Sequence, residues 1–164
     1  DGAIGMKTGF TGKAGYCFVG AVRQDGRTFV SVVLGCGWPP HKTYKWSDTR
    51  KLMSYGINNF FPQKILVPDP DFGKICVTGG VSDECGTEIT DSLEMLVSSA
   101  ENIDISYEMP EYVEAPVHKG DAVGYVHIKI NGQSHISYPI KIKDDVEEVD
   151  YLWFFNKIID DYTL

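Results

Sequence analysis

The dipeptide Asp25-Gly26, set between two apolar runs, constrains the fold of this chain more than any other feature. Asp-Gly favours the left-handed backbone that a two-residue hairpin turn requires. We therefore predict antiparallel strands over Tyr16–Arg23 and Thr28–Cys36. Both runs are almost continuously apolar, which is typical of a sheet that is covered on both faces.

The stretch Ala3–Tyr16, just before this hairpin, holds the residues with the clearest chemistry. The tripeptide Lys7-Thr8-Gly9 follows a short apolar run. On a strand edge, the Lys7 ammonium and the Thr8 hydroxyl would face the carboxylate end of a peptide. Gly9 has no side chain, so a peptide backbone can approach closely. We expect a loop over Phe10–Gly15 and a three-stranded antiparallel meander in total.

A helix is predicted after the meander, over Thr43–Asn59. Thr43 is a suitable N-cap, and Pro62 enforces the end of the helix. The apolar residues that recur at helical spacing are Trp46, Met53, Ile57 and Phe60. We expect this apolar stripe to pack on the sheet.

The charge of the chain changes sign near residue 60. Residues 1–60 hold eight basic and three acidic residues, a net charge of +5, whereas residues 61–164 hold seven basic and twenty acidic residues, a net charge of −13. A change of this size predicts a domain boundary, so we divide the chain into residues 1–60 and 61–164. It also argues against nucleic acid as the main partner, because such proteins need a basic face.

Short strands separated by turn residues fill the second half, a pattern that predicts a small β-sandwich. The predicted strands are Gln63–Val67, Gly73–Val77, Leu93–Val97, Ile103–Glu108, Ala122–Lys129 and Gln133–Lys143. The last two form a hairpin around Asn131-Gly132. We favour a three-residue bulged loop there, because it sets Val126 opposite Ile136.

Residues 149–162 have apolar side chains at helical spacing and predict a short amphipathic helix. Two roles are open for it: docking on the sandwich, or lying at a membrane surface. No stretch approaches the roughly 20 apolar residues of a membrane span, and the N-terminus lacks a signal-peptide pattern.

The four cysteines include no Cys-x-x-Cys pair, and the four histidines are scattered, so we predict neither a zinc site nor another cofactor. Cys17 and Cys36 lie in apolar strand patterns and are expected to be buried thiols. Cys76 and Cys85 flank a Thr-Gly-Gly turn, where either a disulfide or two free thiols is compatible with the spacing.

Three stretches in this order resemble one known family. They read Gly-Ala-Ile-Gly-Met-Lys-Thr-Gly-Phe-Thr-Gly-Lys-Ala-Gly-Tyr-Cys (residues 2–17), Lys-Leu-Met-Ser-Tyr-Gly (residues 51–56) and Glu-Ala-Pro-Val-His-Lys-Gly-Asp-Ala-Val-Gly (residues 114–124). Together they are similar to the C-terminal portion of serine-type D-alanyl-D-alanine carboxypeptidases, the low-molecular-mass penicillin-binding proteins. The resemblance implies an α+β fold. The C-terminal part of a penicillin-binding/β-lactamase-like antiparallel sheet plus helix would be followed by a small all-β sandwich domain.

The resemblance also implies a function. In this family a serine attacks the D-Ala-D-Ala bond of a peptidoglycan stem peptide, D-Ala leaves, and water hydrolyses the acyl-enzyme. Lys7 would be the catalytic residue of this chain. It would bind the substrate carboxylate together with the Thr8 hydroxyl, Gly9 would leave room for the substrate backbone, and the Phe10 N–H would contribute to the oxyanion hole. β-Lactams would enter the same site. The expected location is the bacterial cell envelope, with any membrane anchor beyond Leu164.

The sequence departs from this family in one large respect, since it contains neither Ser-x-x-Lys nor Ser-x-Asn. Without a nucleophile an oxyanion hole does not acylate, so we expect these 164 residues alone to be inactive. The chain opens inside a strand approach, and we expect it to be a fragment or a processed piece. Its exposed sheet would then pair with the missing N-terminal part or self-associate.

Two other interpretations stay open. In one, the chain is a non-catalytic β-rich binding module that acts on a partner protein or on the cell wall, and Lys7-Thr8-Gly9 is merely the end of a strand. In the other, the chain derives from a β-lactamase, which the β domain after the helix disfavours.

Overall fold

The computed structural model describes residues 2–162, with side chains through Ile159. Within it the chain forms two compact units. The first comprises Asp1–Gln63 and Met95–Ala100, and the second comprises Lys64–Glu94 and Glu101–Leu164. A short segment from the middle of the chain therefore belongs to the N-terminal unit.

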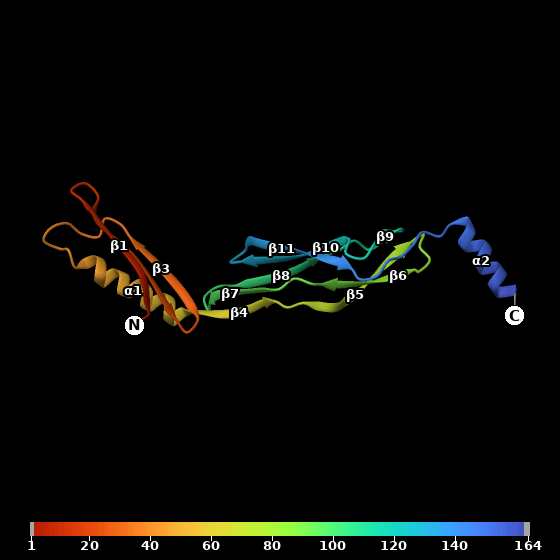
Figure 1. The fold of residues 1–164 in the computed structure, drawn as a ribbon, viewed down its shortest axis with the longest axis horizontal. Helices are drawn as coiled ribbons and strands as arrows, with labels where there is room; N and C mark the ends of the chain where they lie inside the picture. The colour runs from red at the N-terminus through yellow and green to blue at the C-terminus, as the bar shows by residue number, and fades with distance from the viewer. Residues whose placement is uncertain (1, 163–164) are drawn as a thin grey trace. The chain divides into compact units, whose positions relative to one another are not determined.

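The first unit is a three-stranded antiparallel sheet with one helix against it (Figure 1). Its strands are β1 (Ala3–Thr11), β2 (Gly15–Gln24) and β3 (Arg27–Val33), in that spatial order. The helix is α1 (Tyr44–Asn59). The predicted meander and the predicted helix are both confirmed.

The turn between β2 and β3 is the expected two-residue hairpin. Gln24 pairs with Arg27, and Asp25 and Gly26 have φ angles of 50° and 75°. Two positive φ angles in sequence match the right-handed twist of the flanking strands, which explains why Asp-Gly occurs here.

Two strand ends differ from the prediction. β1 continues through Thr11, so the loop before β2 contains only residues 12–14 rather than Phe10–Gly15. β3 ends at Val33 rather than Cys36, because Gly35 has a φ of 60° and leaves the extended conformation.

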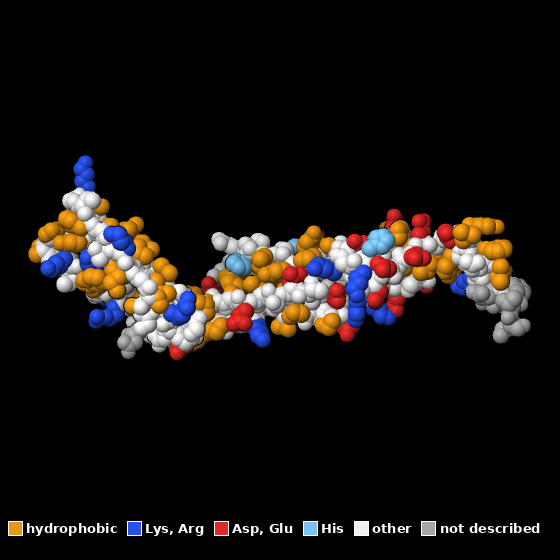
Figure 2. All heavy atoms as spheres, in the orientation of Figure 1, with side chains coloured by type: hydrophobic (Ala, Val, Ile, Leu, Met, Phe, Trp, Pro, Cys, Tyr) orange, Lys and Arg blue, Asp and Glu red, His pale blue; other side chains and the backbone are white. Residues whose placement is uncertain are grey.

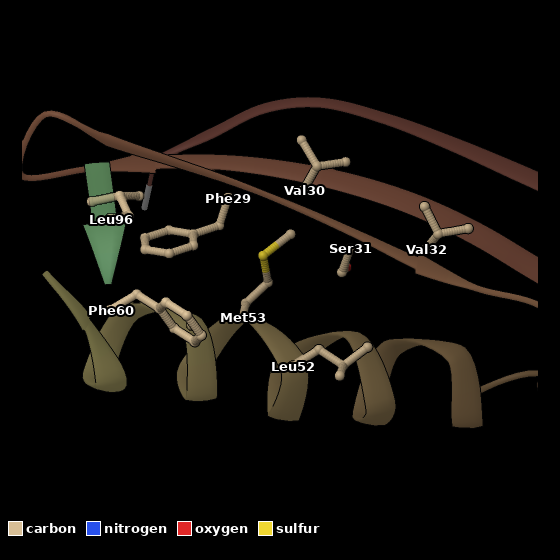
Figure 3. Close-up of a pocket in the computed structure, with 9 residues that line it drawn as sticks. Phe29, Val30, Ser31, Val32, Leu52, Met53, Phe60 and Leu96 are labelled. Carbon is tan, nitrogen blue, oxygen red and sulfur yellow. The ribbon is translucent and has the colours of Figure 1, made fainter. Parts of the chain in front are cut away.

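Helix α1 packs on one face of the sheet, and the Phe18 ring lies edge-on to Trp46 with the ring centroids 4.6 Å apart. Figure 3 shows Phe29 and Met53 between the sheet and the helix, whereas Val30 and Val32 point away from the helix. Thr43 precedes the helix but makes no side-chain capping hydrogen bond. Its own backbone is already helical, so its hydroxyl cannot cap in the usual way.

The second unit contains a six-stranded sheet, and two further strands pair with each other. The six strands, in spatial order, are β8 (Ile103–Glu108), β10 (Ala122–Ile130), β11 (Gln133–Ile142), β6 (Glu84–Ile89), β5 (Asp69–Thr78) and β9 (Tyr112–Glu114). The pair is β4 (Phe60–Leu66) and β7 (Leu93–Ser98), and each of its strands begins in one unit and ends in the other.

The core of the second unit is aliphatic. Val126, Ile128, Ile140 and Ile142 are completely buried on the central hairpin. An adjoining cluster also includes Ile75, Val77, Cys85, Val117 and Val146. This sandwich-like arrangement, with the sheet-and-helix unit before it, is the α+β fold that the sequence predicts.

The β10–β11 hairpin corrects our loop prediction. Ile130 pairs with Gln133, so the loop has two residues rather than three. A register shift farther along, between Ile128 and Lys129, then sets Ile128 opposite Ile136. Val126 consequently pairs with Tyr138 and not with Ile136. The bulge lies within β11 rather than in the loop. The hairpin therefore retains the favourable two-residue Asn-Gly turn, and its apolar side chains still lie on the same face.

The sequence prediction missed β6 and β9. β6 has a glycine and two glutamates among its six residues, and both residue types are depleted in strands. β9 has only three residues and pairs in parallel with β5. In β5 and β6, Ile75 pairs with Cys85, so Cys76 is one position out of register with Cys85. All four cysteines are free thiols.

The C-terminal helix α2 (Tyr151–Tyr162) does not dock as the first of our two alternatives proposed. Tyr151, Leu152, Phe154, Phe155 and Ile158 are between 51% and 82% exposed. A helix docked on the sandwich would bury these side chains, so the docking interpretation is wrong for the described residues.

Candidate functional site

The four predicted site residues lie consecutively in the middle and second half of β1, an edge strand of the first unit. Every residue of β1 is exposed. Lys7 pairs with Val19, Thr8 with Phe18, Gly9 with Cys17 and Phe10 with Tyr16 across the β1–β2 ladder. The opposite edge of β1 has no strand beside it within the described residues and is open to an extended ligand.

Lys7 and Thr8 project to opposite faces of β1. Residues directly opposite in a ladder share a face, and the partner of Thr8 is Phe18, whose ring contacts helix α1. Lys7 therefore lies on the face away from α1. Its Nζ donates a hydrogen bond to the Thr8 carbonyl oxygen at 3.1 Å. Both residues are exposed, on opposite faces of a strand whose outer edge is unpaired among the described residues.

The loop after β1 is held in place by residues that the sequence analysis did not single out. Trp38 Nε1 donates to the Gly12 carbonyl oxygen at 2.9 Å, and the Thr11 hydroxyl accepts from the Ala14 N–H at 3.0 Å. Gly15 has a φ of 69°, and a Cβ there would lie 3.0 Å from the Trp38 ring. These contacts fix the C-terminal end of β1 and so the geometry of Phe10.

A buried lysine lies under the same end of the sheet. Lys45 is 9% exposed, and its Nζ lies 5.1 Å from the ring centroids of both Tyr16 and Trp46. The Tyr16 ring in turn packs on Phe10 at 4.5 Å. Stacking of a cation on aromatic faces stabilises this arrangement and adds positive charge behind the site. The helical periodicity of the sequence does not predict the burial of Lys45, because lysine is normally a surface residue.

Cys36 links the strand region to the helix. Its Sγ donates to Asp48 Oδ2 at 3.1 Å. This hydrogen bond to the Asp48 carboxylate, with burial and the negative charge of Asp48 adding to it, raises the pKa of the Cys36 thiol. The thiol therefore stays protonated and is a structural group rather than a nucleophile.

An apolar groove of about 460 Å³ lies between β3 and α1 in the first unit (Figure 3). It is lined by Phe29, Met53, Phe60 and Leu96 among others. Ser31 lies in the same groove, is 7% exposed, and its hydroxyl has no hydrogen-bond partner among the described residues. Because β3 is also an edge strand, this side of the sheet offers both apolar surface and unpaired backbone groups.

Acidic side chains are scattered among basic and apolar ones on the visible face of the second unit, whereas the charged side chains visible on the first are mainly basic (Figure 2). Within residues 2–162, no group of three or more His, Cys, Asp or Glu side chains is arranged to hold a metal ion. None of the helices in that part of the chain is long and apolar enough to cross a bilayer.

Comparison with known proteins identifies the second half of the chain. Residues 62–148 match the model of the penicillin-binding protein 5 C-terminal domain. The chain belongs to this family. Similar curated proteins include D-alanyl-D-alanine carboxypeptidase DacC of Escherichia coli, 31% identical over 95% of this chain, and D-alanyl-D-alanine carboxypeptidase DacF of Bacillus subtilis, 22% identical over 99%. The chain spans 38% and 42% of their respective lengths.

Solved structures match the fold of this chain. The D-alanyl-D-alanine carboxypeptidase DacD of Francisella tularensis matches 91% of this chain with a TM-score of 0.60 and 25% identity, and the match covers 37% of that protein. A peptidoglycan synthesis regulatory factor (PBP3) of Streptococcus pneumoniae matches 89% of this chain with a TM-score of 0.57 and 24% identity, which supports the fold alone. The resemblance seen in the sequence to the C-terminal portion of a low-molecular-mass penicillin-binding protein is thus confirmed.

Proposed function

We propose that this chain is part of a D-alanyl-D-alanine carboxypeptidase that trims the terminal D-Ala from peptidoglycan stem peptides through a serine acyl-enzyme. The observation that carries the proposal is the exposed edge strand β1 with Lys7-Thr8-Gly9 in the middle of it, ahead of a penicillin-binding protein 5 C-terminal domain. Relatives that carry the carboxypeptidase name align along nearly the whole chain, which supports the same activity for the complete protein.

Each residue of the strand has a role in this proposal. A stem peptide lies extended along the free edge of β1, and the exposed Lys7 ammonium attracts its terminal carboxylate. The Thr8 hydroxyl donates a hydrogen bond to the same carboxylate. Gly9 leaves room for the peptide backbone, and the Phe10 N–H stabilises the developing oxyanion. β-Lactams bind in the same way, with their carboxylate at Lys7.

The nucleophile of this reaction lies outside the 164 residues, because none of their serines has a lysine three positions later. We therefore propose that the chain alone does not acylate. The rest of the protein would cover the open edge of β3 and the apolar groove beside it. The complete protein would act in the cell envelope, and the exposed aromatic helix α2 would contact the membrane surface.

Lys7→Ala in the complete protein tests the proposal. We expect labelling by a fluorescent penicillin to slow by at least about 100-fold, because a charge-assisted contact to the carboxylate is lost. Thermal unfolding should be unchanged, since an exposed lysine contributes little to stability.

Lys13→Ala is the matched control, because Lys13 is an exposed lysine in the loop that follows β1. It should label like the natural protein. Equal labelling of the Lys7 and Lys13 variants would remove Lys7 from the site and favour the non-catalytic binding module.

A further inference from the structure

Strand β8 forms one edge of the six-stranded sheet and has no neighbour on its outer side within the described residues. Five of its six residues are exposed. Its two faces differ in chemistry, because side chains alternate along a strand. One face carries Asp104, Ser106 and Glu108, while the other carries apolar side chains that include Ile105 and Tyr107, which are 39% and 56% exposed. An exposed edge with one apolar face is a template for strand addition.

The carboxylate of Glu108 is held in a defined position. Its Oε2 lies 2.9 Å from Nε2 of His127, and Nδ1 of His127 lies 2.8 Å from the Ser137 hydroxyl. These three residues lie on three adjacent strands, β8, β10 and β11. The Glu108 side chain is nevertheless 77% exposed, so it remains accessible to a partner.

A hollow of about 400 Å³ lies beside Glu108. Met109, Pro110, Val123 and Tyr125 contribute to its lining. Glu108 is itself a lining residue, and an acidic group, an aromatic ring and aliphatic walls together suit the long stem and cationic head of arginine or lysine. The hollow is large enough for one such side chain.

Asp104 extends the acidic face at the other end of the strand. Its Oδ2 accepts a hydrogen bond from Asn102 Nδ2 at 3.0 Å, and Lys129 lies opposite it on β10. Lys129 offsets part of its charge, so Glu108 is the stronger of the two cation-binding positions. The surrounding residues 61–164 carry a net charge of −13, which attracts a cationic partner over a longer range.

We propose that the outer edge of β8 is a docking site for an extended basic segment of a partner protein. The segment adds a seventh strand to the sheet. Basic residues at its first and fifth positions lie opposite Glu108 and Asp104, and apolar residues at its second and fourth positions cover Tyr107 and Ile105. A second copy of the chain fits less well. Antiparallel pairing centred on Ser106 would set Asp104 of each copy opposite Glu108 of the other.

The test uses the 164-residue chain and the acetylated, amidated peptide Arg-Val-Thr-Val-Arg with a fluorescent label. We expect saturable binding by fluorescence anisotropy, and none by the matched peptide Glu-Val-Thr-Val-Glu. Glu108→Lys should weaken binding by about tenfold or more, through loss of an ion pair and gain of repulsion. Glu114→Lys makes the same change of net charge on β9, the strand at the other edge of the sheet. This control variant should change the affinity for the peptide less than about twofold.

Two N-methylated peptides separate strand addition from simple charge attraction. Alternate amides of an added strand face β8, so methylation at odd positions or at even positions should abolish binding in one peptide and spare it in the other. Equal binding of both peptides, or binding that Glu108→Lys leaves unchanged, would overturn the proposal. No binding at all would also overturn it, and the acids of β8 would then serve only to keep this edge unpaired.

Discussion

Arg27 shows how one side chain at the start of a strand can hold a helix in place. Its Nη1 donates to the carbonyl oxygens of Ile57 and Phe60, at 2.9 and 2.7 Å. The guanidinium also lies 5.1 Å from the centroid of the Phe61 ring. The last carbonyl groups of a helix lack partners within the helix, and a cation beside them is favourable for its dipole. The Arg27 side chain is 9% exposed, so these bonds are largely shielded from water.

We predict that Arg27→Ala lowers the free energy of unfolding of the first unit by about 2–3 kcal/mol, because two charge-assisted hydrogen bonds are lost and two carbonyls are left unpaired. Hydrogen exchange of the α1 amides would measure the effect locally. Arg23→Ala is the control, since Arg23 is exposed on the same hairpin and its side chain donates to the Thr28 hydroxyl rather than to any helix carbonyl among the described contacts. Equal protection of α1 in both variants would contradict this role for Arg27.

At the scale of elements, α2 carries a run of exposed apolar side chains along its described length. It combines Tyr, Trp and Phe with Lys157, which lies 4.6 Å from the Trp153 ring centroid. Aromatic side chains of this kind prefer the boundary between lipid and water. With docking on the sandwich excluded, contact with a membrane surface is the remaining role that we proposed for it.

We predict that the chain co-sediments with phospholipid vesicles and that the double variant Leu152→Asp/Phe155→Asp binds them roughly 100-fold less tightly, since two apolar side chains no longer enter the lipid. Val67→Asp is the matched control, because Val67 is 60% exposed but lies outside α2. If the double variant and the control bind vesicles alike, α2 is not a membrane contact.

Most elements were predictable because their signals are local. The Asp25-Gly26 turn and the span of β8 follow directly from turn chemistry and alternation. The features that were not predictable depend on contacts between residues that are far apart in the sequence. Lys45 is buried only because two aromatic rings come together around it, and the position of the bulge in β11 depends on which pairing buries Ile128. Within the candidate site, the location of Lys7 on a strand was predictable, but the support of its loop by Trp38 was not.

At the scale of the whole molecule, one face of the first sheet is uncovered among the described residues. Val30, Val32 and Leu34 are 64%, 55% and 75% exposed, and Figure 3 shows the first two pointing away from α1. Neighbouring exposed apolar side chains of this kind mark an interaction surface. They lie next to the open edge of β3, which can add further strands.

We predict that the isolated chain self-associates and that its weight-average mass in sedimentation equilibrium rises with concentration. The double variant Val30→Thr/Val32→Thr keeps strand propensity but removes apolar surface, so its mass should fall toward that of the monomer. Val67→Thr should behave like the unaltered chain. A monomeric unaltered chain at every concentration would exclude association through this face.

The assignment of Met95–Ala100 to the first unit has a practical consequence for domain exchange. Leu96 lines the groove beside Phe29 and Met53, although more than thirty positions separate it from the end of the unit's main segment at Gln63. If the chain were exchanged at a single junction after Gln63, Leu96 would be replaced together with the second unit. The groove of the first unit would then lose one of its own lining residues. Swapping the C-terminal domains of two relatives therefore requires three junctions, after Gln63, Glu94 and Ala100, so that the six residues Met95–Ala100 stay with the unit that they complete.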